Sequence, residues 1–226
     1  MKPLIIISPS VDESEREIKL SRAYFEAVRL AGGTALVSDY GDIEELLERA
    51  DGILLSGGGD IEPALTGDIP DDASRGQVSR ARDAFEFELV RKAVEMDMPV
   101  LGICRGMQVI GGAFGGHIIQ HMEGHMQTEP KNVPSHDITI AEDSLLFKIT
   151  KTRSMKVNSF HHQAVGNGFL GKITAVSADG FAEALEIADK SFVLGVQWHP
   201  ELLTESTENL NIFKRFTEAA GRYREK

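Results

Sequence analysis

The chain has 226 residues, of which 42% are apolar and 26% charged, as expected for one globular domain or at most two small ones. Its 24 basic and 35 acidic residues give a formal net charge of −11, which argues against nucleic acid or an anionic membrane as the main partner. The single cysteine excludes an intrachain disulfide.

The N-terminal half is predicted to alternate short strands with helices. The strands are apolar runs without polar alternation, typical of a parallel sheet buried on both faces, and cover residues 4–7, 34–38, 52–56 and 99–103. Helices are predicted over residues 20–31, 42–49, 80–96 and 105–114. Residues 60–77 are rich in Pro, Gly and Asp and are expected to form a loop. This order implies right-handed crossovers.

The sequence pattern changes after residue 115. Strands separated by turns are predicted over residues 136–141, 155–158, 172–177, 184–188 and 192–197. Leu210, Phe213 and Phe216 mark an amphipathic closing helix. With no linker or repeat, residues 1–226 are predicted to form a single α/β domain. Its three layers would be a mostly parallel central sheet, flanking helices and a few extra antiparallel strands.

No part of the sequence suggests export or membrane insertion. No apolar stretch approaches the roughly 18 residues that span a bilayer. The N-terminal apolar run is short and has no small-residue cleavage site, so a cytoplasmic protein without a membrane partner is expected.

The segment Gly102–Gly106 has the form G-x-nucleophile-x-G between a predicted strand and a predicted helix. This is the context of a nucleophile elbow, where a strained turn requires neighbours without side chains. The helix N-terminus would favour the thiolate form of Cys104. The alternative is a buried structural cysteine, the commoner fate of a lone one.

A histidine and a carboxylate follow the last predicted strand. His199 could act as the base that a thiol nucleophile needs, and Glu201 could fix its tautomer. Considered alone, the His-Pro-Glu segment is better explained as a surface turn.

A third motif, the glycine-rich segment 56–60, follows the third predicted strand. Such loops bind anions, but no phosphate-loop lysine follows. The loop could instead supply an oxyanion donor, with the N–H of Arg105 as the second. All three motifs lie at carboxyl ends of predicted strands, where open α/β sheets place their sites.

Together these motifs resemble a known group of proteins. Gly-Ile-Cys-Arg-Gly-Met-Gln at 102–108 and Gln-Trp-His-Pro-Glu at 197–201 are similar to motifs of the class I glutamine amidotransferase-like superfamily, which has a flavodoxin-like fold. The segments 58–63, 82–86 and 157–163 are similar to those of its γ-glutamyl hydrolase branch, peptidase family C26. That branch includes γ-glutamyl-γ-aminobutyrate hydrolases. The resemblance extends to about Phe216.

The resemblance implies a role for each matching residue. Cys104 would be the nucleophile, His199 the general base and acid, and Glu201 the orienting carboxylate. The backbone N–H groups of Gly58 and Arg105 would form the oxyanion hole. Four residues would bind the substrate: Gln108, His161, His162 and Gln163. No cofactor is implied.

The implied reaction is hydrolysis of the γ-glutamyl amide bond of a small γ-glutamyl compound through a cysteine thioester. Two alternatives stay open: a glutaminase component that delivers ammonia to a separate synthase, and a non-catalytic ligand-binding or regulatory protein on the same fold. A homodimer is also open. Departures from the branch at 64–67, Gly112 and 120–121 leave the identity of the leaving amine open.

Other polar residues have competing explanations. His117, His121 and His125 are four residues apart, as metal ligands on a helix would be, but glycines interrupt any helix there and the segment is better predicted as a strand. No metal site is therefore expected. Arg82 and Asp83 fit either the pocket or a solvated helix start. The adjacent His161 and His162 fit the site better than polar packing.

Overall fold

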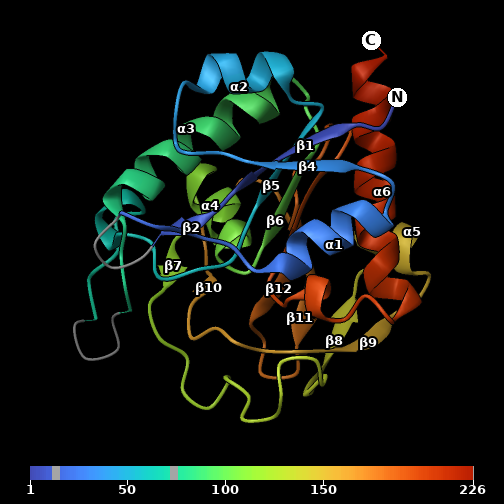
Figure 1. The fold of residues 1–226 in the computed structure, drawn as a ribbon. Helices are drawn as coiled ribbons and strands as arrows, with labels where there is room; N and C mark the ends of the chain where they lie inside the picture. Colours follow the sequence, from blue (N-terminus) through green and yellow to red (C-terminus); the bar gives the residue numbers. More distant parts are fainter. Residues whose placement is uncertain (12–15, 72–75, 226) are drawn as a thin grey trace.

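A nine-stranded mixed sheet forms the centre of the computed structural model, which describes residues 1–11, 16–71 and 76–225 (Figure 1). In spatial order its strands are β4 (Thr34–Val37), β1 (Leu4–Ser8), β5 (Gly52–Leu55), β6 (Val100–Ile103), β13 (Val193–Val196), β12 (Ala182–Glu186), β11 (Lys172–Ser177), β8 (His136–Ile140) and β9 (Ser154–Val157). The first five strands pair in parallel. The later pairs, from β13–β12 to β8–β9, are antiparallel.

Helices cover both faces of this sheet and give it three layers (Figure 1). The apolar residues of β1 show why both faces need cover: Ile5 and Ile7 pack on one side and Ile6 on the other. The first side is covered by α1 (Arg22–Leu30), α5 (Leu145–Thr150) and α6 (Thr207–Arg224). The second side is covered by α2 (Ile43–Arg49), α3 (Arg80–Glu95) and α4 (Arg105–Ala113).

The predicted α/β fold class is confirmed, with an antiparallel half larger than the few strands expected. The strand predicted at 184–188 begins two residues earlier, at Ala182. Helix α5 and three two-residue strands were not predicted, because such short elements show no measurable periodicity in the sequence. These strands are β2 (Ser10–Val11), its partner β3 (Ile18–Lys19), and β10 (Ala164–Val165), which pairs with β7 (Ile118–Ile119).

The loop predicted over 60–77 is only partly described. It contains a short 3-10 helix, η1 (Pro63–Leu65), and its residues 72–75 lie outside the described part.

Among the described helices, none is long and apolar enough to cross a membrane.

The parallel half of the sheet determines where the predicted motifs meet. Strands β5, β6 and β13 are neighbours and run in the same direction, so their carboxyl ends share one edge. The glycine-rich segment, Cys104 and the Gln197–Glu201 segment each follow one of these ends. Sheet topology therefore brings the three motifs together from positions that are far apart in the sequence.

Candidate functional site

Cys104 occupies a strained turn between β6 and α4. Its φ of 54° and ψ of −108° lie in a region that residues with side chains rarely adopt, at a cost of about 1–3 kcal/mol. The flanking glycines permit close packing: a Cβ on Gly102 would lie 2.5 Å from the carbonyl oxygen of Gly106, and one on Gly106 would lie 2.2 Å from that of Leu55. The geometry is that of the nucleophile elbow predicted from the sequence.

His199 lies between a carboxylate and this cysteine. Its Nδ1 is 2.7 Å from Oε1 of Glu201, which lies in the 3-10 helix η2 (Pro200–Leu202). Cys104 lies close enough to the ring to influence the pKa of His199. A Cβ built on Gly57 would lie 2.8 Å from Cε1 of His199 and 3.5 Å from Cβ of Cys104, so the glycine-rich segment contacts both residues. The predicted nucleophile, base and carboxylate are therefore adjacent.

The charges around His199 favour its protonated form. Burial alone would lower the pKa of its ring, but the negative charges of Glu201 and Cys104 and their hydrogen bonds outweigh burial and raise this pKa well above its usual value. These interactions therefore favour the imidazolium form of His199, which can act as a proton donor.

The cysteine side chain is enclosed by the surrounding protein. Cys104 is only 4% exposed, whereas the His199 side chain is 15% exposed. A cavity of about 530 Å³ is lined partly by Tyr24, Ser56 and Gly57. The structure thus places open space next to the loop that adjoins the thiol.

The glycine-rich loop is held by the guanidinium of Arg82. Its Nη1 donates to the carbonyl of Gly57 at 3.1 Å, and its Nη2 donates to the carbonyl of Ser56 at 2.8 Å. Because a trans peptide directs its C=O and N–H to opposite sides, the bond to the Gly57 carbonyl turns the N–H of Gly58 away from Arg82. Similarly, the Cys104 carbonyl accepts bonds within α4, which turns the N–H of Arg105 away from the helix body.

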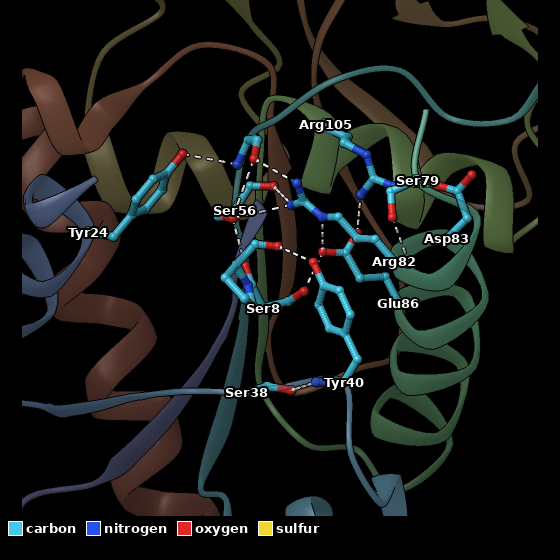
Figure 2. A network of polar contacts seen from close by, with 12 residues as sticks. Ser8, Tyr24, Ser38, Tyr40, Ser56, Ser79, Arg82, Asp83, Glu86 and Arg105 are labelled. Atoms are coloured by element: carbon cyan, nitrogen blue, oxygen red, sulfur yellow. Dashed lines mark hydrogen bonds and ion pairs between the residues drawn. The ribbon is translucent and has the colours of Figure 1, made fainter. Parts of the chain in front are cut away.

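Tyr24 is a second support of this loop, and its polar role was not predicted from the sequence. Its buried hydroxyl accepts a hydrogen bond from the N–H of Gly57 at 3.0 Å (Figure 2). Burial, and then the charge of Glu201, raises the pKa of Tyr24 well above its usual value, so the phenol stays neutral. The sequence places Tyr24 only on the apolar face of a helix, and that pattern carries no sign of a hydrogen bond.

Arg82 also belongs to a buried network of two cations and two anions, shown in Figure 2. The side chains of Arg82, Asp83, Glu86 and Arg105 are each at most 2% exposed. Nε of Arg82 lies 2.9 Å from Glu86, and Arg105 pairs with both Asp83 and Glu86. The solvated-helix explanation of Arg82 and Asp83 is therefore wrong, because these side chains are buried and the network joins α3 to Arg105, the residue after Cys104.

The predicted substrate-binding residues separate into different surroundings. Nε2 of Gln108 donates to the backbone carbonyl of Gln163 at 3.0 Å, so these two residues lie together. Nε2 of His162 lies 3.0 Å from Asp60, at the end of the glycine-rich segment. His161 contacts the Gln163 carbonyl through Nδ1, at 3.0 Å, while its Nε2 lies 3.8 Å from Glu183 on β12.

Asn158 fixes the backbone of His199. Its Oδ1 accepts from the N–H of His199 at 2.8 Å, and its Nδ2 donates to the carbonyl of the same residue at 3.3 Å. Asn158 lies within one of the motifs noted in the sequence, but only the fold shows that it contacts the chain near the triad.

The three histidines with four-residue spacing do not converge. His117 pairs with Asp68 at 2.8 Å, and His121 lies against His162 at 3.5 Å. His125 instead contacts Asp179 and Glu183. Residues 118–119 form strand β7, in agreement with the predicted strand.

Comparison with known proteins identifies the family of this chain. A sequence profile of the peptidase C26 family matches residues 6–201. A Rickettsia prowazekii protein, provisionally named glutamine amidotransferase-like, is 32% identical over 97% of this chain and 98% of its own. The γ-glutamyl-γ-aminobutyrate hydrolase of Escherichia coli K12 is 32% identical over 80% of this chain and 78% of its own.

A solved structure supports the fold. It is a Thermoplasma acidophilum protein, provisionally named as a subunit of GMP synthase, with a TM-score of 0.74 and 17% identity; the match covers 100% of this chain and 97% of the other. The chain belongs to the peptidase C26 family, within the class I glutamine amidotransferase-like proteins.

Proposed function

We propose that this protein is a cysteine-dependent hydrolase of the γ-glutamyl amide bond in a small γ-glutamyl compound. The observation that carries the proposal is the placement of His199 between Glu201, at 2.7 Å, and Cys104 at a strained elbow. The hydrolase named among the relatives supports the substrate class. A purely structural cysteine would need neither the strained backbone nor the oriented imidazole.

The first half-reaction forms a thioester. The Cys104 thiolate attacks the γ-carbonyl carbon, and the resulting oxyanion accepts hydrogen bonds from the N–H groups of Gly58 and Arg105. When the intermediate collapses, the C–N bond breaks and the leaving amine takes the proton of His199. The neutral His199 stays oriented by Glu201.

The second half-reaction hydrolyses the thioester. His199 takes a proton from water as the water oxygen attacks the thioester carbon. Collapse of the second oxyanion breaks the C–S bond, releases glutamate and restores the thiolate with a protonated His199. No electrons are transferred, and water is the sole co-reactant. The groups at Gln108, His162 and Gln163 would hold the glutamyl part of the substrate.

A screen of γ-glutamyl compounds that differ only in the amine tests this proposal. The measurement is glutamate release by the wild-type protein, with Cys104→Ala as the matched control. We expect release from γ-glutamyl-γ-aminobutyrate or a similar amide, and none from the variant. Absence of release from every amide, glutamine included, would contradict the proposal.

The same screen separates the alternatives. Slow release from glutamine alone, without release from the other amides, would favour a glutaminase component that works with a synthase. An absence of turnover together with an iodoacetamide-resistant Cys104 would favour a non-catalytic protein on this fold.

A further inference from the structure

A second cluster of titratable side chains lies in the antiparallel half of the molecule. It contains three histidines around one carboxylate: His125, His136, His161 and Glu183. Oε1 of Glu183 lies 3.1 Å from Nε2 of His125, 3.1 Å from Nε2 of His136 and 3.8 Å from Nε2 of His161. We call this group the histidine cluster. Its members come from three separate loops or strand ends and from β12.

The spacing of these atoms suits a small metal ion. One ligand atom each from His125, His161 and Glu183 all lie within 4.8 Å of one another. Ligand atoms at about 2.0–2.1 Å from a tetrahedral Zn²⁺ are roughly 3.4 Å apart. The separations of 3.1 Å and 3.8 Å lie on either side of that value, so small side-chain movements would complete the geometry.

Two buried atoms of the cluster have no hydrogen-bond partner among the described residues. They are Nε2 of His161 and Oε2 of Glu183, whose side chains are 2% and 0% exposed. The other nitrogen of His161, Nδ1, bonds to the backbone carbonyl of Gln163 at 3.0 Å and must therefore carry its proton. With its proton on Nδ1, the neutral ring has a lone pair on Nε2. A lone pair facing a carboxylate is repulsive unless a cation lies between them.

The surrounding groups orient the imidazoles as metal ligands are oriented. Nδ1 of His125 lies 2.8 Å from Oδ2 of Asp179, and Nδ1 of His161 bonds to a carbonyl. Histidines that bind metals commonly donate their second N–H to such oxygens, which directs the free nitrogen at the ion. Here both free nitrogens are directed toward Glu183.

A protonated His125 is the competing explanation. Burial opposes protonation of His125, but hydrogen bonds to Glu183 and Asp179 raise its pKa above the usual value. An imidazolium between two carboxylates would be stable. This explanation leaves Nε2 of His161 and Oε2 of Glu183 unpaired in the interior, which is costly for each group. A metal ion would bind Nε2 of His161 and Nε2 of His125 together.

An opening leads to the cluster from outside. A cavity of about 420 Å³ is lined in part by His125, His136, Ser135, Ser177 and Asp179. The side chain of His136, at 24% exposed, lies on the solvent side of the cluster.

We propose that the histidine cluster binds one divalent transition-metal ion of the Zn²⁺ type, through His125, His161 and Glu183. Imidazole with a single carboxylate suits this class of ion better than Mg²⁺ or Ca²⁺.

Two backbone contacts connect the proposed site to the candidate active site. The carbonyl of Gln163, which accepts from His161, also accepts from Gln108. The carbonyl of Glu183 accepts from the N–H of Gln197, two residues before His199. Bound metal would thus stabilise the 158–163 segment and the end of β13 without touching the substrate.

Metal content and metal binding of the full chain test the proposal. The protein is stripped with a chelator, dialysed and titrated with Zn²⁺, and bound zinc per chain is measured by elemental analysis, with the melting temperature as a second measurement. The titration is repeated with Cys104→Ala, because a thiol beside His199 could bind zinc by itself. We expect one tightly bound zinc per chain in both proteins and a higher melting temperature with zinc.

Variants assign the site. His161→Gln and Glu183→Gln should each lose stoichiometric zinc, whereas His117→Gln, which alters an exposed histidine outside the cluster, should retain it. If Glu183→Gln fails to fold, the zinc content of His161→Gln and of the wild-type protein still tests the proposed site. Three results would each overturn the proposal. The first is less than one zinc per wild-type chain at micromolar metal, and the second is loss of zinc only in Cys104→Ala. The third is equal zinc retention in His161→Gln and His117→Gln.

Discussion

Two sets of contacts hold the residues around Cys104 in place. Glu201 and Asn158 fix His199, the first through its ring and the second through its backbone. Tyr24 and Arg82 fix the glycine-rich loop that would receive the oxyanion. The supports of His199 lie within motifs visible in the sequence, whereas the polar role of Tyr24 becomes visible only in the fold.

Tyr24→Phe should lower kcat by about tenfold and leave KM nearly unchanged. The substitution removes the acceptor of the Gly57 N–H, so the loop and the neighbouring Gly58 N–H lose part of their orientation. Steady-state kinetics on the best substrate measure both constants. Tyr223→Phe, far from the triad on α6, is the matched control and should behave as wild type. A Tyr24→Phe enzyme with unchanged kcat would show that the hydroxyl plays no part in positioning.

The elements of the site are joined by buried contacts that tolerate little change. The close approach of α4 to β5 is one example: a Cβ on Gly106 would lie 2.2 Å from the Leu55 carbonyl oxygen. The buried ion network between α3 and α4 is another, because each of its charges depends on partners in the other element or loop.

Gly106→Ala should destabilise the fold strongly, since the added methyl group would displace β5 or α4 at the elbow. Gly221→Ala is the matched control: Gly221 lies in α6 with no heavy atom within 4 Å of its ideal Cβ, so the substitution should stabilise by about 0.5–1 kcal/mol. Melting temperatures of the two variants check both signs. Equal melting temperatures would contradict the predicted crowding at the elbow.

Arg82→Met should lower the free energy of unfolding by about 3–5 kcal/mol, because it removes one cation from a buried, balanced network. It should also reduce turnover, since the carbonyls of Ser56 and Gly57 lose their donor.

Urea unfolding and glutamate release measure the two effects of Arg82→Met. The control is Arg153→Met, which breaks an exposed pair with Glu142 and should cost less than about 1 kcal/mol. Similar losses in the two variants would mean that burial of the network adds no stability.

For the molecule as a whole, the sequence predicts the parallel half better than the antiparallel half. Continuous apolar runs identify β1, β5, β6 and β13, and parallel pairing then brings Cys104, His199 and Glu201 to one edge. The histidine cluster could not be predicted in the same way. His125 and His161 lie in irregular segments, and only tertiary packing brings them to Glu183.

Burial also answers whether Arg82 and Asp83 at the start of α3 are solvated or part of the site. Arg82, Asp83 and Glu86 occur at a helix start, where charged residues are ordinarily exposed. Three charges in one short stretch do not reveal that Arg105, some twenty positions later, completes a balanced network. Only the contact of Arg105 with Asp83 and Glu86 distinguishes a buried network from a solvated helix start.

Acid should destabilise the metal-free protein through His161. Its pKa of about 4 in the fold lies below the value of roughly 6.5 in an unfolded chain, so the unfolded state binds the proton first. The stability that comes from a neutral His161 is complete above pH 6.5 and is lost as the pH falls toward 4, by up to about 3 kcal/mol.

Urea unfolding of wild type and His161→Gln at several pH values, in chelator, measures this loss. The stability difference between the two proteins should shift in favour of the variant as the pH falls from 6.5 to 4. His125, whose pKa is raised, is present in both proteins and so serves as an internal control. A difference that does not change with pH would contradict the buried, neutral state of His161.

The most direct test of the account is to trap the covalent intermediate on Cys104. The protein is mixed with a γ-glutamyl amide that it hydrolyses, quenched in acid during turnover and analysed by intact and peptide mass. The account predicts one glutamyl adduct on the peptide that contains Cys104, and no adduct and no turnover in Cys104→Ala. Glutamate release that persists in Cys104→Ala, with no adduct on the wild-type protein, would contradict it.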